Sequence, residues 1–166
     1  MLVSPAGGGK TVVLRALKAS LPEARYRVVY LKLANLSARD MCRQIAHAMN
    51  LPPAGQYPRL VQALEERFRT GYEDQGVRQV LIMDDAHEMR PEVIRLVRLL
   101  TNFEMDSRLL VSIILAGQMP LKLRLMEDDL EDIRQRLAYC AELRLLSREN
   151  AHRYVDHRVK IAGVSK

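Results

Sequence analysis

The sequence predicts an α/β fold in which helices cover both faces of a parallel sheet. Short apolar runs typical of buried strands alternate, along the 166 residues, with longer segments in which apolar residues recur at helical spacing. A glycine-rich segment separates the first apolar run from the first helical stretch. The hydrophobic content of 48% argues against disorder, and the length suits one domain, over residues 1–166, with its own core.

Five strands are expected, and each leads into a helix, which gives a right-handed, three-layer α/β/α sandwich around a five-stranded parallel sheet. The expected strands cover residues 2–3, 28–33, 80–84, 109–116 and 139–145. The expected helices cover residues 12–20, 38–49, 57–72, 91–103, 120–137 and 148–162.

Capping residues and apolar spacing define these helices. Ser37 is expected to cap the second helix, with Asp40 in its first turn. Pro91 opens the fourth helix, and Ser147 caps the last one. The apolar residues expected to face the core from the third and fourth helices are Leu60, Ala63, Leu64, Phe68, Val93, Leu96, Val97 and Leu100.

The segment between the first strand and the first helix predicts a phosphate-binding loop, because glycines let backbone N–H groups turn inward around a phosphate at a helix N-terminus. We expect Lys10 to reach the β- and γ-phosphates of a nucleotide and the Thr11 hydroxyl to hold Mg²⁺. The strict pattern begins with glycine where this chain has a small serine, and the alternative is a glycine-rich loop with an incidental lysine. The candidate nucleotide-binding residues are Ser4, Pro5, Ala6, Gly7, Gly8, Gly9, Lys10 and Thr11.

A second motif supports the first. The apolar run 80–83 ends in Asp84 and Asp85, which is typical of a buried parallel strand with carboxylates at its C-terminal end. Asp84 is expected to hold Mg²⁺, and Asp85 to act as the general base that polarises the attacking water. The alternative is a strand that ends in a polar turn. Both motifs and Gln118 should meet where the parallel strands end, since ligands bind at that edge.

Composition excludes several classes of protein. No apolar run approaches the length of a membrane span, and the N-terminus has no signal-peptide pattern, so the chain is expected to be cytoplasmic or the cytosolic part of an inner-membrane-associated protein. Cys42 and Cys140 match no metal-ligand spacing and are expected to be core thiols. Basic residues predominate in 1–50 and 134–166 and acidic residues in 51–133, which could serve nucleic acid or head-to-tail assembly.

The ordered set of motifs resembles the AAA+ ATPases, and among them the group that contains ExeA-like secretion ATPases and transposition ATPases of the TnsC, TniB and MuB kind. The resemblance covers nearly the whole chain. It is carried by the glycine loop, by Asp84-Asp-Ala-His87, and by stretches 99–103, 115–120, 133–137, 145–149, 154–158 and 162–163. The Gly117-Gln-Met-Pro120 and Arg134-Gln-Arg136 stretches are the most specific of these.

The resemblance implies roles for three further residues. Gln118 takes the place of the polar residue that senses the γ-phosphate or holds the attacking water, with a polar strand cap as the alternative. Arg136, with Arg134 nearby, takes the place of the arginine finger that reaches a neighbouring protomer's nucleotide. The alternative is that both arginines pair with Glu131 and Asp132. The resemblance also implies ATP and Mg²⁺ as cofactors and assembly of the chain with itself into rings or filaments.

The chain departs from the family in three respects. Asp85 replaces the usual glutamate and is one methylene shorter, and because a displacement of about 1 Å can lower a rate about a hundredfold, slow turnover without assembly or a partner is expected. The segment that precedes the first strand in the family and contacts adenine is absent. The helical lid domain is also missing, so the chain resembles an AAA+ core truncated at both ends.

Three readings of function follow. The first is an ATPase that assembles on double-stranded DNA and directs a transposase, with Lys32, Arg39 and Arg43 as candidate DNA contacts. The second is an ExeA-like ATPase of a general secretion pathway, whose partners are secretion-complex proteins. The third is a nucleotide-binding switch with negligible hydrolysis. The sequence favours the DNA-associated reading over secretion because both ends of the chain are basic.

Overall fold

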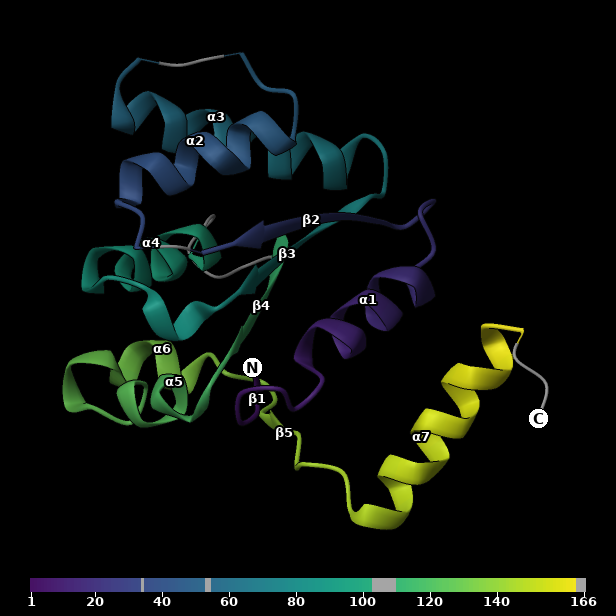
Figure 1. Ribbon diagram of the computed structural model, residues 1–166. Coiled ribbons are helices and arrows are strands. Elements are labelled where there is room, and N and C mark those ends of the chain that lie inside the picture. Colours follow the sequence, from purple (N-terminus) through teal and green to yellow (C-terminus); the bar gives the residue numbers. More distant parts are fainter. Residues whose placement is uncertain (34, 53–54, 103–109, 164–166) are drawn as a thin grey trace.

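The computed structural model describes residues 1–33, 35–52, 55–102 and 110–163. Its centre is a five-stranded sheet in the order β2-β3-β4-β1-β5, in which every pair of neighbours runs parallel (Figure 1). The expected α/β class and five-stranded parallel sheet are therefore confirmed. The strands are β1 (Leu2–Val3), β2 (Tyr26–Lys32), β3 (Arg78–Asp84), β4 (Val111–Gly117) and β5 (Ala141–Glu142).

The helices follow the predicted order and, in most cases, the predicted bounds. As predicted, the Ser37 hydroxyl accepts a hydrogen bond from the Asp40 amide, and the Ser147 hydroxyl accepts one from the Asn150 amide. These bonds satisfy N–H groups that the first turn of a helix leaves unpaired. The helices are α1 (Lys10–Ser20), α2 (Ala38–Ala48), α3 (Tyr57–Glu73), α4 (Pro91–Thr101), α5 (Met119–Arg124), α6 (Glu131–Gln135) and α7 (Arg148–Ile161).

The two faces of the sheet are covered unequally. Helices α2 to α6 build a large apolar core on one face, in which Leu64 and Phe68 of α3 are fully buried and Ala63 is half-buried. On the other face α1 packs Leu14 against Ile82 of β3 and Ala116 of β4, with a much smaller core. Alternation of side chains along the strands produces both cores, because successive residues of a strand point to opposite faces.

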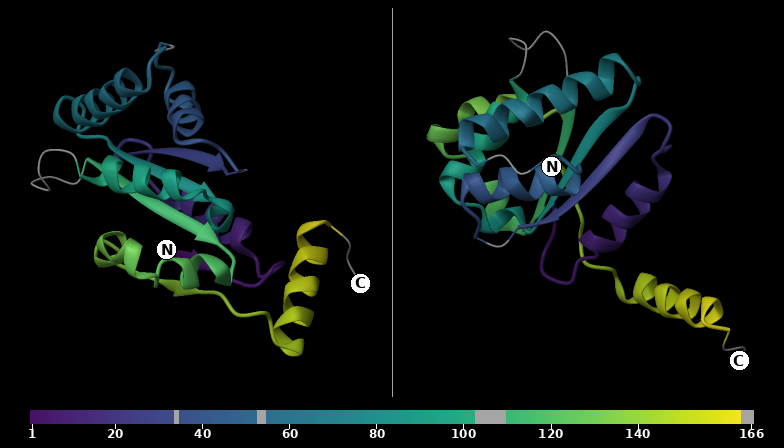
Figure 2. Two further views of the ribbon diagram at one scale, coloured as in Figure 1. Left: turned by 90° about the vertical axis from the view of Figure 1, so that its left-hand side faces the viewer. Right: turned by 90° about the horizontal axis from the view of Figure 1, so that it is seen from above.

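Helix α7 projects from the body of the fold, as the two views in Figure 2 show. None of its residues is buried, and Tyr154, Val155 and Ile161 are exposed apolar side chains. Within the described ranges, no helix is both long and apolar enough to cross a membrane. Cys42 is buried as expected, whereas Cys140, which lies just before β5, is exposed and is not a core thiol.

The prediction of one continuous helix over 120–137 is wrong. The chain instead forms α5, a short 3-10 turn at Asp128–Leu130, and α6. The four buried residues of this region are Leu121, Leu125, Leu130 and Ile133. A step of five residues along an unbroken helix turns about 140° away from the starting direction, so one helix could not direct Leu125 and Leu130 to the same core. The break allows all four to be buried.

The last strand is shorter than predicted. Only residues 141 and 142 form β5, instead of 139–145, because β5 pairs with the two-residue strand β1. The amides of Ala141 and Leu143 donate to the carbonyls of Met1 and Val3, on either side of Leu2. Helix α4 ends at Thr101, two residues before its predicted end, and Phe103 and Leu109 lie outside the described residues.

Candidate nucleotide site

A pocket of about 610 Å³ lies where β1, β3 and β4 end. The parallel register sets this meeting point, because Val3 pairs with Gly117 and Met83 pairs with Leu115. The polypeptide therefore leaves all three strands at the same edge of the sheet. The residues lining the pocket are Ala6, Gly7, Gly8, Gly9, Lys10, Thr11, Val12, Arg15, Tyr30, Lys32, Asp84, Asp85 and Gln118.

The glycine loop uses backbone positions that favour glycine. Gly7 and Gly9 have φ values of +72° and +86°, in the left-handed region that side chains rarely adopt, and Gly9 is the N-cap of α1. Gly8 is required for a different reason: a Cβ atom built there would lie 2.8 Å from Oγ and 2.9 Å from Cβ of Ser4. Backbone conformation therefore favours glycine at positions 7 and 9, and lack of space favours it at position 8.

Ser4 is accommodated in place of the usual glycine. It is fully buried, its amide donates to the Gly117 carbonyl, and its hydroxyl donates to the Pro5 carbonyl at 2.8 Å. The Lys10 ammonium group donates to Ser4 Oγ at 3.2 Å. The serine side chain thus fits into the space that Gly8 leaves, and its hydroxyl accepts a hydrogen bond from Lys10.

Asp84 is held by two hydrogen bonds at the end of β3. Its Oδ1 accepts from the Asp85 amide at 2.9 Å, and its Oδ2 accepts from the Tyr30 hydroxyl at 2.6 Å. Only 4% of Asp84 is exposed. A carboxylate offers about four lone-pair positions, so two bonds fix its orientation and leave it able to accept from a metal-bound water.

Asp85 turns the chain sharply away from β3. Its φ of +57° and ψ of +33° lie in the left-handed region, which aspartate tolerates better than most residues. Its carboxylate lies at the wall of the pocket, with Oδ2 3.9 Å from Lys32 Nζ. Because 73% of the Lys32 side chain is exposed, this ion pair is a weak one.

Gln118 follows β4 directly and begins α5 as its N-cap. Its side-chain amide nitrogen lies 3.0 Å from Nε2 of His87, within hydrogen-bond distance. His87 Nδ1 is buried and has no hydrogen-bond partner among the described residues. The last residue of the Asp84-Asp-Ala-His87 motif thus positions the side chain that is expected to sense the γ-phosphate.

The residues present fit a magnesium–nucleotide complex. A hydroxyl on Thr11 and a carboxylate on Asp84 are the oxygen donors that Mg²⁺ accepts alongside phosphate and water. Gly7 and Gly9 hold the loop in left-handed backbone conformations, and a turn of this kind directs successive backbone N–H groups towards a bound anion. Thr11 and Asp84 would hold the metal, and Lys10 with the loop amides would hold the phosphates.

Arg134 and Arg136 lie outside this pocket. Arg134 pairs with Glu131 at 3.3 Å, as the alternative expected, whereas Asp132 pairs with Arg98 of α4 at 2.6 Å. Arg136 is exposed and donates to the Thr101 carbonyl at 3.5 Å and to Asn102 Oδ1 at 3.4 Å.

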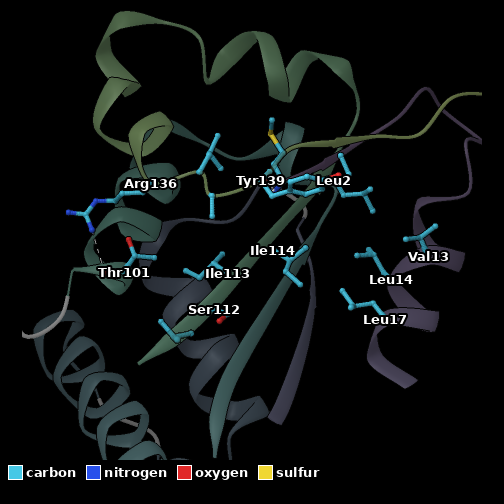
Figure 3. A pocket seen from close by; sticks show the side chains of 15 residues that line it. Leu2, Val13, Leu14, Leu17, Thr101, Ser112, Ile113, Ile114, Arg136 and Tyr139 are labelled. Carbon is cyan, nitrogen blue, oxygen red and sulfur yellow. Dashed lines mark hydrogen bonds between the residues drawn. The ribbon is translucent and has the colours of Figure 1, made fainter. Parts of the chain in front are cut away.

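Arg136 borders a second, apolar pocket of about 720 Å³ (Figure 3). That figure shows its guanidinium directed towards Thr101, on the side of the pocket opposite Val13 and Leu14 of α1. No residue lines both pockets. Arg136 is therefore not among the residues that line this chain's own nucleotide pocket.

Sequence reasoning did not assign four residues to the nucleotide pocket, namely Val12, Arg15, Tyr30 and Lys32. It also missed the contact of His87 with Gln118. The signal for Tyr30 was the alternation of β2, which places residues 26, 28 and 30 on one face. This signal becomes useful only when the pairing of Lys32 with Asp84 is known. Arg15 is four residues after Thr11 on α1, a spacing that places both on one side of the helix.

Comparison with known proteins gives consistent results. The sequence model of the family described as "AAA domain" matches residues 1–125. General secretion pathway protein A of Aeromonas hydrophila is 31% identical over 166 residues, which cover 98% of this chain and 30% of that protein. This chain thus spans less than a third of that curated relative.

Two solved structures share the fold. The ORC2 protein of Aeropyrum pernix, in ADPNP–ADP complexes, has a TM-score of 0.73 at 15% identity, over 96% of this chain and 45% of its own. Cdc6p of Pyrobaculum aerophilum has a TM-score of 0.64 at 20% identity, over 86% of this chain and 38% of its own. At identities of 15% and 20%, these similarities show a shared fold and nothing more specific.

The steric reason for Gly8 gives a testable prediction. Gly8→Ala should weaken ATP binding at least about tenfold, because the new Cβ would displace Ser4 and with it the loop amides. Gly55→Ala is the matched control, since a Cβ at Gly55 meets no atom within 4 Å. Isothermal titration calorimetry with ATP measures both variants. Equal affinities for Gly8→Ala and the unmodified chain would contradict the steric account.

Proposed function

The chain belongs to the AAA domain family, and from this premise we propose that it is a Mg²⁺-dependent ATPase whose hydrolytic site is the pocket at the ends of β1, β3 and β4. One observation carries the proposal: the glycine loop, Lys10, Thr11, Asp84, Asp85 and Gln118 line one pocket. These groups come from three separate stretches of sequence, and the sheet brings them together in one pocket. Together they are the groups that phosphoryl transfer requires: phosphate-binding, metal-binding and water-orienting residues.

Each residue has a distinct task in the proposed reaction. Lys10 and the loop amides neutralise charge on the β- and γ-phosphates, and Thr11 and Asp84 hold the metal. Bound Mg²⁺ would supply charge neutralisation and orientation of the phosphates. Asp85 accepts the proton of the attacking water, and Gln118, held by His87, orients that water or contacts the γ-phosphate.

Two features of the Asp85 carboxylate support slow basal turnover. The aspartate is one methylene shorter than glutamate, and its Oδ2 lies 3.9 Å from Lys32 Nζ, so an exposed ammonium group competes with the attacking water for this oxygen. A base must come within about 2.6–3.2 Å of the proton it removes, or act through a water. If Asp85 never reaches the water, the chain is instead a nucleotide-binding switch with negligible hydrolysis.

The proposed biological role is that of an ExeA-like ATPase of a secretion pathway, supported by the similarity to general secretion pathway protein A along almost the whole chain. The DNA-associated role, favoured by the sequence alone, becomes the second candidate. Its three candidate DNA contacts are engaged within the chain: Lys32 pairs with Asp85, Arg39 donates to the Gly55 carbonyl, and Arg43 pairs with Asp40. The basic ends of the chain still support it.

We also propose that the chain assembles with itself and that Arg136 acts on the nucleotide of a neighbouring copy. The supporting observation is that Arg136 is exposed and borders a pocket separate from its own nucleotide site. An arginine supplied by another copy makes hydrolysis depend on assembly. The partners proposed for the assembled form are secretion-complex proteins or, for the second candidate, double-stranded DNA and a transposase.

Removal of single groups from the pocket separates binding from hydrolysis. Lys10→Ala should abolish measurable ATP binding, whereas Asp85→Asn should bind ATP normally and lose turnover about a hundredfold or more. Lys18→Ala, which removes an exposed lysine from the same helix, is the control for lost positive charge. Calorimetry and a phosphate-release assay provide the two measurements. Undiminished hydrolysis by Asp85→Asn would remove Asp85 from the role of base.

The arginine proposal concerns only the assembled protein. Arg136→Ala should lower turnover by about a thousandfold at protein concentrations that give oligomers, and leave the turnover of dilute monomers unchanged. Arg59→Ala, an exposed arginine of α3, serves as the control. Phosphate release measured against protein concentration, with light scattering on the same samples, tests this. A similar loss in monomers would contradict action on a neighbour.

Double-stranded DNA distinguishes the two candidate roles. For the secretion role, added DNA should leave the ATPase rate unchanged at both 50 and 200 mM salt, roughly the range over which phosphate contacts lose their strength. The DNA-associated role predicts strong stimulation that falls steeply with salt. Phosphate release in the presence of a DNA duplex, with a polyanion such as heparin as the charge control, measures this. Salt-sensitive stimulation by DNA alone would reverse the order of the two candidates.

A further inference from the structure

We propose that Tyr30 is a positioning residue for the metal: its hydroxyl fixes the carboxylate of Asp84 in the orientation that binds Mg²⁺ with its nucleotide. This inference rests on the proposed ATPase function and adds to it a residue outside both sequence motifs. Its basis is the 2.6 Å hydrogen bond from Tyr30 Oη to Asp84 Oδ2.

The sheet places Tyr30 beside Asp84. Strands β2 and β3 pair in parallel, with Tyr30 opposite Ile82 and Lys32 opposite Asp84. Residues two apart on a strand share a face, so Tyr30, Ile82 and Asp84 all point to the face covered by α1. From its position diagonal to Asp84, the tyrosine side chain is long enough for its hydroxyl to reach the carboxylate.

Tyr30 also lies near Thr11, the second residue that would hold the metal. It lines the nucleotide pocket together with Thr11 and Asp84, and a smaller neighbouring pocket together with Thr11, Leu14 and Arg15 of α1. The phenol therefore stands between the first turns of α1 and the end of β3. The Asp84 carboxylate and the Thr11 hydroxyl are both metal ligands in the proposed site. Tyr30 bonds to the first and lines two pockets together with the second.

The chemistry of the pair suits a structural donor. Asp84 is almost completely buried, and its Oδ1 is held by the Asp85 amide, so the Tyr30 bond fixes the remaining oxygen. Burial, and then the hydrogen bond to Asp84, raise the pKa of Tyr30 to about 12, so the phenol remains protonated at neutral pH. Partners that hydrogen-bond to metal ligands fix the orientation of those ligands, and their removal commonly costs about 10–100-fold in metal affinity.

Tyr30→Phe is the direct test, because it removes one hydroxyl and keeps the ring. Tyr26→Phe is the matched control: Tyr26 lies on the same strand and the same face, packs against the small core beneath α1, and lines no part of the nucleotide pocket. Binding of a fluorescent ATP analogue is measured while free Mg²⁺ is raised from zero. Thermal unfolding without Mg²⁺ verifies that both variants are folded.

The expected result is an increase of about tenfold in the Mg²⁺ concentration that gives half of the metal-dependent gain in affinity, for Tyr30→Phe alone. The shift in the Mg²⁺ titration should exceed any change in nucleotide affinity measured without Mg²⁺. A Mg²⁺ titration of Tyr30→Phe that overlays the unmodified chain overturns the inference, as does an equal shift in Tyr26→Phe. Absence of nucleotide binding by the unmodified chain is a separate result, which refutes the proposed function and this inference together.

Discussion

The parallel register of the three strands β3, β4 and β1 is the constraint on which the rest of the site depends. Pairing of Val3 with Gly117, and of Met83 with Leu115, fixes the height at which each strand ends. The Ser4 amide then donates to the Gly117 carbonyl, so the glycine loop starts at the same level as Gln118. A shift of one residue in any of these pairs would turn side chains to the opposite face and separate the loop from the acids.

Local patterns were sufficient to predict the sheet, the glycine loop and most helices. Serine caps, prolines at helix starts and apolar spacing act over a few residues, and for that reason Ser37 and Ser147 were identified correctly. The break between α5 and α6 was missed, because it depends on which leucines reach the core. The short β5 was missed for a similar reason, since its length is set by β1, far away in the sequence.

The same distinction applies to the candidate site. The pocket residues that carry a motif were found from the sequence, whereas their partners were not. These partner contacts depend on how neighbouring strands and turns align. They are the contacts of Tyr30 with Asp84, of Lys32 with Asp85 and of His87 with Gln118. These partners orient the groups that the motifs supply, and orientation within about 1 Å governs the rate of phosphoryl transfer. Structure therefore adds here the part of the mechanism that a motif leaves unspecified.

Hydrogen exchange with and without a magnesium–nucleotide complex tests the central claim most directly, because it reports where on the chain the nucleotide binds. The account predicts slower amide exchange in residues 4–13 and 84–87, and at the end of β4, when Mg²⁺ and a non-hydrolysable ATP analogue are added. Protection confined to the apolar pocket bordered by Arg136, or no protection of the glycine loop at saturating nucleotide, would contradict it.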